Sequence, residues 1–422
     1  MRILWVKSGG LVPLDHGGKI RSFHLAKELT RSHEVSLFTF YEPIPNDQHA
    51  ELKTTFRKVL CVPLSIPRKN GPGEYLAYAK NLFSARPYSV TKYCQPHVMR
   101  ELRRHLEQES YDLVLCDFLL TAGVIPWDLP GPRVLFSHNV EAQIWRRHFE
   151  VARNPVWKAA CYREFRTMAA MERDYLRRAD HVLAVSEADR RIFSRDLDES
   201  RISVIPTGVD ADYFRPSAET EQPNALVFTG SMDWLPNEDG IFHFVEKILP
   251  LVRKEAPDSV LWVVGRRPST NLRALMDRTP GIKVTGTVED IRPYIATGSV
   301  YVVPLLVGGG TRLKIFEAMA MGKAVVSTSI GAEGLPVVDG KHIRLADDPV
   351  KFAREIVSLL REPSQRAQLG ASARQLVEQE YSWNAVGQQL SNVLVRVFDA
   401  FGSNRSRLGT PMSAASESGR GE

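Results

Sequence analysis

The stretch Pro304-Leu-Leu-Val-Gly-Gly-Gly-Thr-Arg-Leu-Lys-Ile-Phe-Glu-Ala-Met-Ala-Met-Gly-Lys-Ala-Val-Val-Ser-Thr328 decides the fold of this chain. It follows a short apolar run at residues 300–303 that predicts a buried strand. Three glycines then interrupt the pattern, and apolar residues resume at helical spacing after Thr311, the expected N-cap. A strand that passes through a glycine turn into a helix is typical of an α/β fold with a parallel sheet.

The same stretch predicts a phosphate-binding site. Glycines let backbone N–H groups approach an anion, and a helix N-terminus adds favourable electrostatics. Arg312 and Lys314 add positive charge, and Glu317 lies about 8 Å further along the helix, a distance that suits a ribose attached to a diphosphate. A glycine turn that only packs on the sheet is the alternative. The predicted donor-binding residues here are Gly308, Gly309, Gly310, Thr311, Arg312, Leu313, Lys314 and Glu317.

The strand and helix pattern occurs twice along the chain, which predicts two doubly wound, Rossmann-like domains facing an interdomain cleft. The first set of strands is expected at residues 2–7, 34–40, 59–62, 113–116, 133–136, 182–185 and 202–205. The second set is expected at residues 225–229, 260–264, 283–285, 300–303 and 324–327. The predicted divisions are an acceptor domain at 1–205, a hinge at 206–224, a donor domain at 225–383, a helix at 384–402 that can pack back on the first domain, and a disordered tail at 403–422.

Composition excludes several classes of protein. The chain has 422 residues, 43% of them hydrophobic and 25% charged, as expected of a folded protein with a sizeable core. The apolar runs at 112–127 and 300–307 are shorter than a bilayer helix requires, and the first ten residues do not form a signal peptide. We therefore expect a cytoplasmic location. The four cysteines form no C-x-x-C pair, so neither a zinc site nor a disulfide framework is predicted.

Positive charge is concentrated in the first half. Residues 1–210 hold 31 Lys and Arg against 25 Asp and Glu, whereas residues 211–422 hold 24 of each. Residues 145–178 contribute nine basic and four acidic residues, interspersed with aromatic side chains in a helical pattern. Such a segment can contact an anionic membrane at its inner face, or it can simply be a solvated helix face. No nucleic-acid-binding signature accompanies the charge, so nucleic acid is not an expected partner.

Several further motifs occur in a fixed order, at residues 185–189, 204–214, 228–237, 289–294 and 331–334. Together with residues 304–328 they resemble the retaining, metal-independent nucleotide-sugar glycosyltransferases of the GT-B fold, glycosyltransferase family 4 or group 1. The likeness covers nearly the whole folded chain. It implies that Gly17, Gly18 and Gly230 also contact the donor, and that His138 lies beside the donor sugar.

The resemblance further implies that His138, Gly18, Arg312 and Lys314 serve catalysis, with no metal ion and no cofactor besides the nucleoside diphosphate sugar. Two departures accompany it. Gly309 stands where many members carry the first of two glutamates, the second matching Glu317. Ser231 and Asn237 stand where other members use Arg and Lys for the diphosphate, so we expect Arg312 and Lys314 to supply that charge.

The implied reaction is transfer of a sugar to a glycan or lipid-linked acceptor, in surface polysaccharide or glycolipid synthesis. Two alternatives stay open at this point: a nucleotide-sugar 2-epimerase of the same architecture, and a non-catalytic nucleotide-sugar-binding subunit. A nicotinamide dehydrogenase is less consistent with the sequence because the G-x-G-x-x-G fingerprint is missing.

Overall fold

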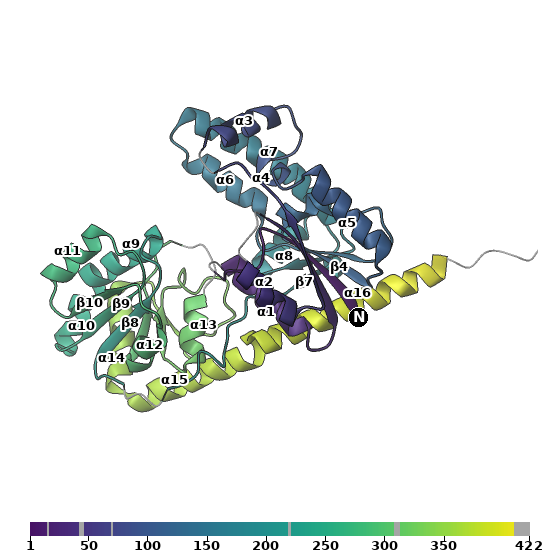
Figure 1. Cartoon of the computed structure of the whole chain (residues 1–422). Helices are drawn as coiled ribbons and strands as arrows, with labels where there is room; N and C mark the ends of the chain where they lie inside the picture. The colour runs from purple at the N-terminus through teal and green to yellow at the C-terminus, as the bar shows by residue number, and fades with distance from the viewer. Residues whose placement is uncertain (15–16, 42–45, 69–70, 218–220, 308–312, 409–422) are drawn as a thin grey trace, which may run out of the picture. The chain divides into compact units, whose positions relative to one another are not determined.

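The computed structural model describes residues 1–14, 17–41, 46–68, 71–217, 221–307 and 313–408 (Figure 1). The chain divides into two compact units. The first comprises Met1–Ile205 and the chain from Gly387 onward, and the second comprises Pro206–Val386. Each unit has its own parallel sheet and its own hydrophobic core.

The sheet of the first unit has seven parallel strands in the order β3-β2-β1-β4-β5-β6-β7. Their bounds are β1 Arg2–Ser8, β2 Glu34–Tyr41, β3 Lys58–Pro63, β4 Leu113–Asp117, β5 Arg133–Phe136, β6 His181–Ala184 and β7 Ile202–Val204. The central strands are apolar on both faces, as in a sheet covered on both sides. The reversal of strand order beside β1 brings the ends of β1 and β4 together at a position where such folds bind ligands.

Helices cover both faces of this sheet. Buried residues of α5, α7 and α8 share one core cluster with β1 and β4. On the other face of the sheet, α1 contacts α16, where Gly387 packs against Glu28. The helices of the first unit are α1 Gly17–Leu29, α2 Asn46–Thr55, α3 Pro72–Asn81, α4 Tyr88–Thr91, α5 Pro96–Gln108, η1 Leu119–Val124, α6 Glu141–Val151, α7 Pro155–Arg178, α8 Glu187–Phe193, η2 Glu199–Arg201 and α16 Trp383–Leu408.

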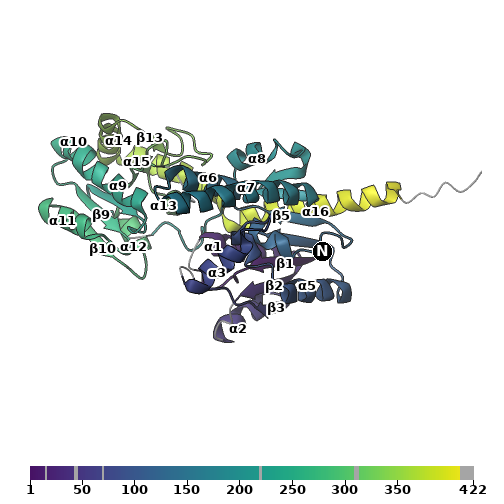
Figure 2. The ribbon, with the colours of Figure 1, turned by 90° about the horizontal axis from the view of Figure 1, so that it is seen from above.

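The basic segment at 145–178 is not one helix. It contains the end of α6, at Val151, and the start of α7, at Pro155. Asn154 is the N-cap of α7, and its side chain accepts a hydrogen bond from the backbone N–H of Trp157. Proline at the first helical position and asparagine before it define a helix start. The two helices pack against each other along the unit (Figure 2).

The sheet of the second unit has six parallel strands in the order β10-β9-β8-β11-β12-β13. Their bounds are β8 Ala225–Thr229, β9 Val260–Val264, β10 Ile282–Gly286, β11 Val300–Val303, β12 Val325–Ser327 and β13 Arg344–Leu345. The helices are α9 Leu235–His243, η3 Phe244–Ile248, α10 Leu249–Glu255, α11 Thr270–Arg278, α12 Arg292–Thr297, α13 Leu313–Ala320, α14 Pro349–Arg361, α15 Pro363–Leu376 and η4 Val377–Tyr381.

The end of the chain differs from the sequence-based expectation. Helix α16 continues to Leu408, into the segment 403–422 for which the sequence predicts a disordered tail. The rest of that predicted tail, residues 409–422, lies outside the described residues. A helix that is already formed can be extended by polar residues at little cost, because each added residue gains a backbone hydrogen bond. From Gly387 onward α16 belongs to the first unit, where His33 Nε2 lies 2.7 Å from Ser391 Oγ and Gln389 donates to the carbonyl of Val204. In the described part of the chain, none of the helices has the length and apolar character needed to cross a membrane.

Close packing in the second unit generates a prediction about its stability. A Cβ atom at Gly370 on α15 would lie 1.9 Å from the carbonyl oxygen of Gly322, so Gly370→Ala must push α15 away from α13. We expect a loss of about 1–3 kcal/mol in unfolding free energy, measured by thermal denaturation. Gly402→Ala on α16 is the control, because a Cβ there meets nothing within 4 Å and should stabilise the helix slightly. Equal melting temperatures for Gly370→Ala and the wild type would contradict this packing argument.

Candidate functional site

Charged side chains gather at the carboxyl edge of the first sheet, where three neighbouring strands end. Lys7 lies near the end of β1, Asp117 ends β4, and His138 follows β5 by two residues. All three side chains are buried. The carboxyl ends of parallel strands meet at one edge, which explains why residues far apart in sequence lie together here.

Asp117 is the centre of this cluster. One carboxylate oxygen accepts a hydrogen bond from Trp5 Nε1 at 2.9 Å and lies 3.2 Å from Lys7 Nζ. The other oxygen lies 2.7 Å from His138 Nε2. Burial alone would raise the pKa of Asp117, but the nearby Lys7 ammonium and the His138 hydrogen bond outweigh it and lower the pKa below its usual value. Asp117 is therefore a buried carboxylate whose charge is balanced by Lys7.

The hydrogen bonds of His138 determine its protonation. Arg21 Nη1 lies 3.2 Å from Nδ1 of His138, and a guanidinium can only donate. The lone pair is therefore on Nδ1 and the proton on Nε2, which donates to Asp117. Burial lowers the pKa of His138 to about 4, against the opposing effect of Asp117, so the ring is neutral near pH 7.

Two aromatic rings enclose His138. Phe118 lies parallel to it with ring centroids 3.7 Å apart and an angle of 13°, and Phe136 lies 4.3 Å away. Phe118 adopts a φ of 72°, which is costly for a bulky residue and directs its ring back over the histidine. A Cβ at Gly18 would lie 2.8 Å from Cζ of Phe118, so the glycine at this position of α1 leaves the space that the ring occupies.

In the second unit, the corresponding sheet edge holds a lysine in a fixed position. Lys314 Nζ donates to Asn237 Oδ1 at 2.7 Å and lies 4.1 Å from the ring centre of Phe228. The Asn237 amide donates in turn to the backbone carbonyl of Ser231 at 2.8 Å. A Cβ at Gly230 would lie 2.7 Å from both Lys314 Nζ and Asn237 Nδ2. The glycine after β8 thus provides the space for the ammonium group.

Glu317 lies one turn after Leu313, the first residue of α13, and both side chains are partly buried. Burial raises the pKa of Glu317 to about 7, opposed by the charge of Lys314. Within the described chain, the carboxylate of Glu317 has no hydrogen bond and no ion pair with another residue. A partly buried acceptor with that pKa is suited to receive hydrogen bonds from hydroxyl groups of a ligand.

The remaining predicted residues divide into two groups. Gly17 begins α1, next to Gly18. Gly308, Gly309, Gly310, Thr311 and Arg312 lie outside the described residues. The structure thus brings together Gly18 and His138 in the first unit, and Gly230, Lys314 and Glu317 in the second.

Sequence reasoning missed four residues of the first cluster: Lys7, Asp117, Arg21 and Phe118. Two of them could have been found from the sequence: Lys7 lies within an apolar strand and Asp117 lies at the carboxyl end of another. A charge at such a position needs a partner, because burying an unpaired charge costs free energy. It also missed Arg266, which follows β9 and donates through Nε to Ser231 Oγ at 2.8 Å, beside the Lys314 site. In the ranges that the structure covers, no group of three His, Cys, Asp or Glu side chains could hold a metal ion.

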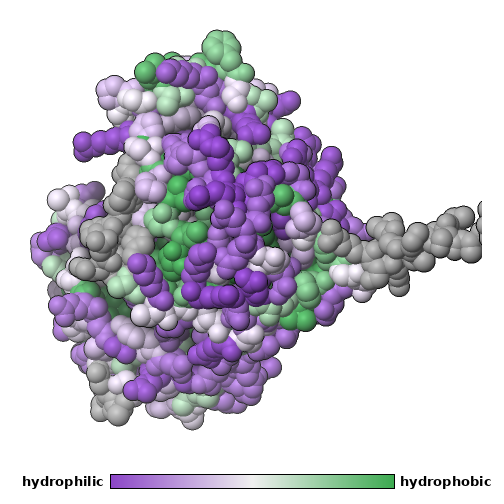
Figure 3. All heavy atoms as spheres, turned by 45° about the vertical axis from the view of Figure 1, so that its right-hand side comes forward, coloured by the Kyte–Doolittle hydropathy of each residue, from purple (hydrophilic) through white to green (hydrophobic). Residues whose placement is uncertain are grey.

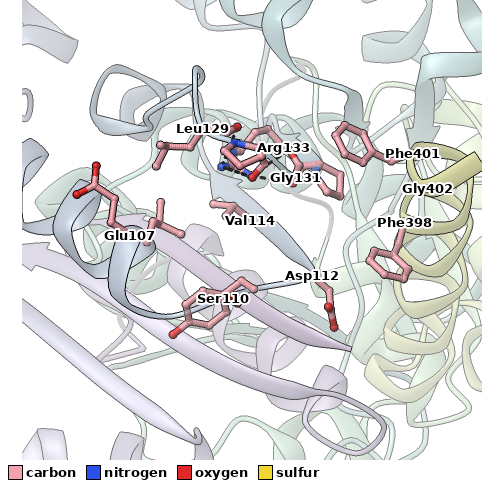
Figure 4. A pocket seen from close by; sticks show the side chains of 14 residues that line it. Glu107, Ser110, Asp112, Val114, Leu129, Gly131, Arg133, Phe398, Phe401 and Gly402 are labelled. Atoms are coloured by element: carbon pink, nitrogen blue, oxygen red, sulfur yellow. Dashed lines mark hydrogen bonds between the residues drawn. The ribbon is translucent and has the colours of Figure 1, made fainter. Parts of the chain in front are cut away.

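A pocket at the opposite, amino-terminal edge of the first sheet is separate from these clusters (Figure 4). It is lined by residues of α5, the start of β4, the turn before β5, and Phe398 and Phe401 of α16. The guanidinium of Arg133 already donates to the backbone carbonyls of Gly131 at 3.0 Å and Leu129 at 3.3 Å. None of the predicted donor residues lies in it, and we assign it no part in the reaction.

Two protein-family models match most of the chain. The family described as "Glycosyltransferase Family 4" matches residues 17–213, and "Glycosyl transferases group 1" matches residues 223–362. The chain belongs to this glycosyltransferase family. All strands except β1, and all residues of both clusters except Trp5 and Lys7 of β1, lie within the matched ranges. The enzyme is therefore a glycosyltransferase of the group 1 type.

Solved structures share the fold of this glycosyltransferase. Sucrose-phosphate synthase from Thermosynechococcus elongatus superposes with a TM-score of 0.65 at 18% identity, over 94% of this chain and 99% of that one. A UDP complex of Anabaena HepE superposes with a TM-score of 0.65 at 15% identity, over 94% of this chain and 100% of that one. These matches identify the α/β architecture as GT-B, as predicted.

Curated relatives share more of their sequence with this chain than these solved structures do. The glycosyltransferase is 22% identical to a 44.6 kDa protein in the cps region of Klebsiella pneumoniae, over 90% of this chain and 96% of the relative. It is 27% identical over 213 residues to a GDP-mannose-dependent mannosyltransferase of Corynebacterium glutamicum, covering 45% of this chain and 55% of the relative. It is 29% identical over 227 residues to a phosphatidyl-myo-inositol mannosyltransferase of Mycolicibacterium smegmatis, covering 52% and 58%. The match spans little more than half the length of these two mannosyltransferases.

The buried Asp117 cluster generates a prediction. Asp117→Asn leaves the Lys7 ammonium buried without its counter-charge, so the glycosyltransferase should lose about 3–5 kcal/mol of unfolding free energy. Chemical denaturation followed by tryptophan fluorescence measures the loss. The double variant Lys7→Met with Asp117→Asn removes both charges and should recover part of that stability. A loss below about 1 kcal/mol for Asp117→Asn, the size expected of an exposed pair, would show that the charge is not balanced as described.

Proposed function

We propose that this glycosyltransferase transfers a sugar from a nucleoside diphosphate sugar to a glycan or lipid-linked acceptor, with retention at the anomeric carbon and without a metal ion. One observation carries the proposal. The Lys314 ammonium is held by Asn237 in the space left by Gly230. Glu317, whose carboxylate has no hydrogen bond or ion pair among the described residues, follows on the same helix. A cation and an acceptor at this spacing suit a diphosphate and the ribose attached to it.

The lysine answers the main chemical demand of the reaction. The bond between the anomeric carbon and the diphosphate oxygen breaks, and negative charge accumulates on the leaving diphosphate. A preorganised ammonium group stabilises that charge without reorganisation during the step. We include Gly308, Gly309, Gly310, Thr311 and Arg312 in the proposed phosphate site because they precede Lys314 directly in sequence. The acceptor oxygen attacks the anomeric carbon on the same face, and its proton passes to the leaving diphosphate.

Asn237 explains a departure from the family pattern. Other members carry a lysine at this position for the diphosphate, whereas here an asparagine orients the lysine of another element, Lys314. The cation is thus supplied from α13 rather than from α9, the helix that carries Asn237. This arrangement supports the proposal that one positive charge serves the leaving group despite the substitution.

His138 is proposed to lie beside the transferred sugar, together with Gly17 and Gly18. Both of its ring nitrogens take part in hydrogen bonds, to Asp117 and Arg21. A direct bond to a sugar hydroxyl therefore requires exchange of one of these partners. The bond to Arg21 is the longer of the two, at 3.2 Å, and is the one we expect to be exchanged.

The relatives support the substrate classes of the proposal. The Anabaena HepE structure was solved with UDP, and the Corynebacterium relative is described as GDP-mannose-dependent and as acting on a phosphatidylinositol monomannoside. The first is consistent with a nucleotide-sugar donor, and the second with a lipid-linked acceptor. The basic residues at 145–178 favour an anionic acceptor or peripheral contact with an anionic membrane surface.

The test is a panel of UDP-, GDP- and ADP-sugars, screened by thermal stabilisation and by hydrolysis of the donor. For the donor that binds, activity should persist in excess EDTA, and NMR of the product should show the anomeric configuration of the donor. Abolition of activity by EDTA would overturn the metal-free mechanism, and an inverted product would overturn retention. Release of a free epimerised sugar without an acceptor would instead indicate the epimerase reaction.

A prediction concerns the space around Lys314. Gly230→Ala places a Cβ within 2.7 Å of the ammonium nitrogen and displaces it, so donor affinity should fall on the order of tenfold. Lys314→Ala should weaken donor binding at least as much, because it removes the charge. Isothermal titration calorimetry with the donor identified above measures both. Gly402→Ala lies in the first unit and is not among the predicted donor-binding residues, so it is the control and should bind the donor as the wild type does. Equal affinity for Gly230→Ala would refute the role of Lys314.

Glu317 predicts a pH dependence of donor binding. Its raised pKa of about 7 means that the carboxylate, which accepts two hydroxyl hydrogen bonds, predominates only above that pH. The affinity for a nucleotide sugar should rise up to about tenfold between about pH 6 and pH 8, since the diphosphate diester itself does not titrate there. Glu317→Gln should bind more weakly and show no such rise. A variant that retains the wild-type pH profile would exclude Glu317 as the ribose acceptor.

A further inference from the structure

Exposed apolar side chains gather at one end of the first unit. Phe83, in the turn after α3, is 97% exposed, and Val151 and Val156, on either side of the turn between α6 and α7, are 74% and 79% exposed. We call this set the docking tip; it consists of Leu76, Leu82, Phe83, Val151, Val156 and Trp157. Large apolar residues this exposed are common singly but need an explanation when they gather in one region.

Hydrogen bonds hold the two parts of the docking tip together. Tyr78 of α3 donates to the carbonyl of Ala160 on α7 at 3.4 Å. Arg163 of α7 donates to the carbonyl of Ser84 at 2.9 Å, in the turn that carries Phe83. Its guanidinium also lies 5.7 Å from the ring centre of Tyr78. The turn after α3 is therefore fixed against α7 rather than projecting independently, and α3 is drawn near α7 in Figure 1.

Aromatic residues and cations surround the tip. Trp145 and Trp157 have ring centroids 6.4 Å apart, and Phe149 and Tyr162 pair at 5.2 Å. Lys158 places its ammonium 5.3 Å from the ring of Phe149. Residues 72–92 and 145–163 together contain eight Lys and Arg but only two acidic residues, Glu74 and Glu150. In Figure 3 the end of the first unit that carries α3 shows hydrophobic atoms beside strongly hydrophilic ones.

The structure also reduces the surface available for membrane contact, which the sequence placed at residues 145–178. In the second half of α7, Met168, Met171, Tyr175 and Leu176 are buried in the core of the first unit. That part of residues 145–178 serves the packing of the domain. The surface available to a partner is the turn between α6 and α7 together with the end of α3, which the sequence did not indicate.

We propose that the docking tip inserts into the surface of an anionic lipid bilayer. Apolar and aromatic side chains next to a ring of cations are typical of proteins that rest in the headgroup region, where the apolar groups enter the acyl boundary and the cations meet lipid phosphates. An acidic protein partner would also attract the cations. However, Phe83, Val156 and Val151 are 97%, 79% and 74% exposed, and side chains that extend this far into solvent are suited to entering the acyl boundary of a bilayer. This proposal concerns a surface apart from the donor site, so either can fail without the other.

Co-sedimentation of the full chain with vesicles tests it. The wild type should bind vesicles of equal parts phosphatidylglycerol and phosphatidylcholine at low salt, should bind phosphatidylcholine vesicles far more weakly, and should be released by added salt. Leu82→Ser with Phe83→Ser should weaken binding about tenfold or more, because two apolar groups no longer enter the bilayer. Val350→Ser on α14, which is 63% exposed, is the matched control and should bind like the wild type.

The charges are tested separately. Arg153→Glu with Lys158→Glu should weaken binding to anionic vesicles by at least about fivefold for each residue changed. Arg195→Glu with Arg354→Glu changes the net charge equally at exposed positions outside the tip and should have a much smaller effect. Donor hydrolysis, measured without any acceptor, should remain at the wild-type rate in every variant, which separates loss of docking from loss of the enzyme. Absence of wild-type binding to anionic vesicles would overturn the proposal, and the docking tip would then be a candidate surface for a protein partner. Undiminished binding by the Leu82 and Phe83 double variant would also overturn it.

Discussion

The proposed donor site depends on one constraint: the Lys314 ammonium must remain charged and fixed at the carboxyl edge of the second sheet. The bond to Asn237, the carbonyl of Ser231 behind it and the missing Cβ of Gly230 all serve that position. Phe228 limits the space on the other side of the ammonium group. A cation placed in this way is available to a diphosphate without first changing its own conformation, which is the condition for stabilising a leaving group.

The first unit solves a different electrostatic problem. Asp117, Lys7, Arg21 and His138 form a buried network in which Lys7 balances the charge of Asp117, Arg21 hydrogen bonds to His138, and the histidine is kept neutral. Burying such groups costs free energy that their mutual bonds must offset, so a fold that only needed stability would use apolar residues instead. The network fixes the tautomer and the orientation of His138, and with Phe118 it determines how close α1 can approach through Gly18.

The sequence predicted the strands well because their apolar runs are uninterrupted. Residues 133–136, 225–229, 260–264 and 300–303 have the predicted bounds. The pattern of strands and helices predicted two doubly wound sheets, whereas the GT-B fold was implied by the resemblance to the family. The sequence analysis did not predict β13, because a strand of two residues is too short to show an alternation of apolar and polar side chains. The clusters could not be predicted in full, because the pairing of Lys7 with Asp117, or of Lys314 with Asn237, depends on strand order and on helix orientation. The exposure of Phe83 likewise depends on which face of the fold its turn occupies, and an isolated phenylalanine in a sequence suggests a core residue.

A crystal structure of the enzyme with its nucleotide sugar tests the central claim most directly. The account predicts the diphosphate within hydrogen-bond distance of Lys314 Nζ, with the bond between Lys314 and Asn237 retained, and the ribose hydroxyls on the Glu317 carboxylate. A nucleotide bound elsewhere in the second unit, or one whose diphosphate is held by a metal ion while Lys314 stays remote, would contradict it.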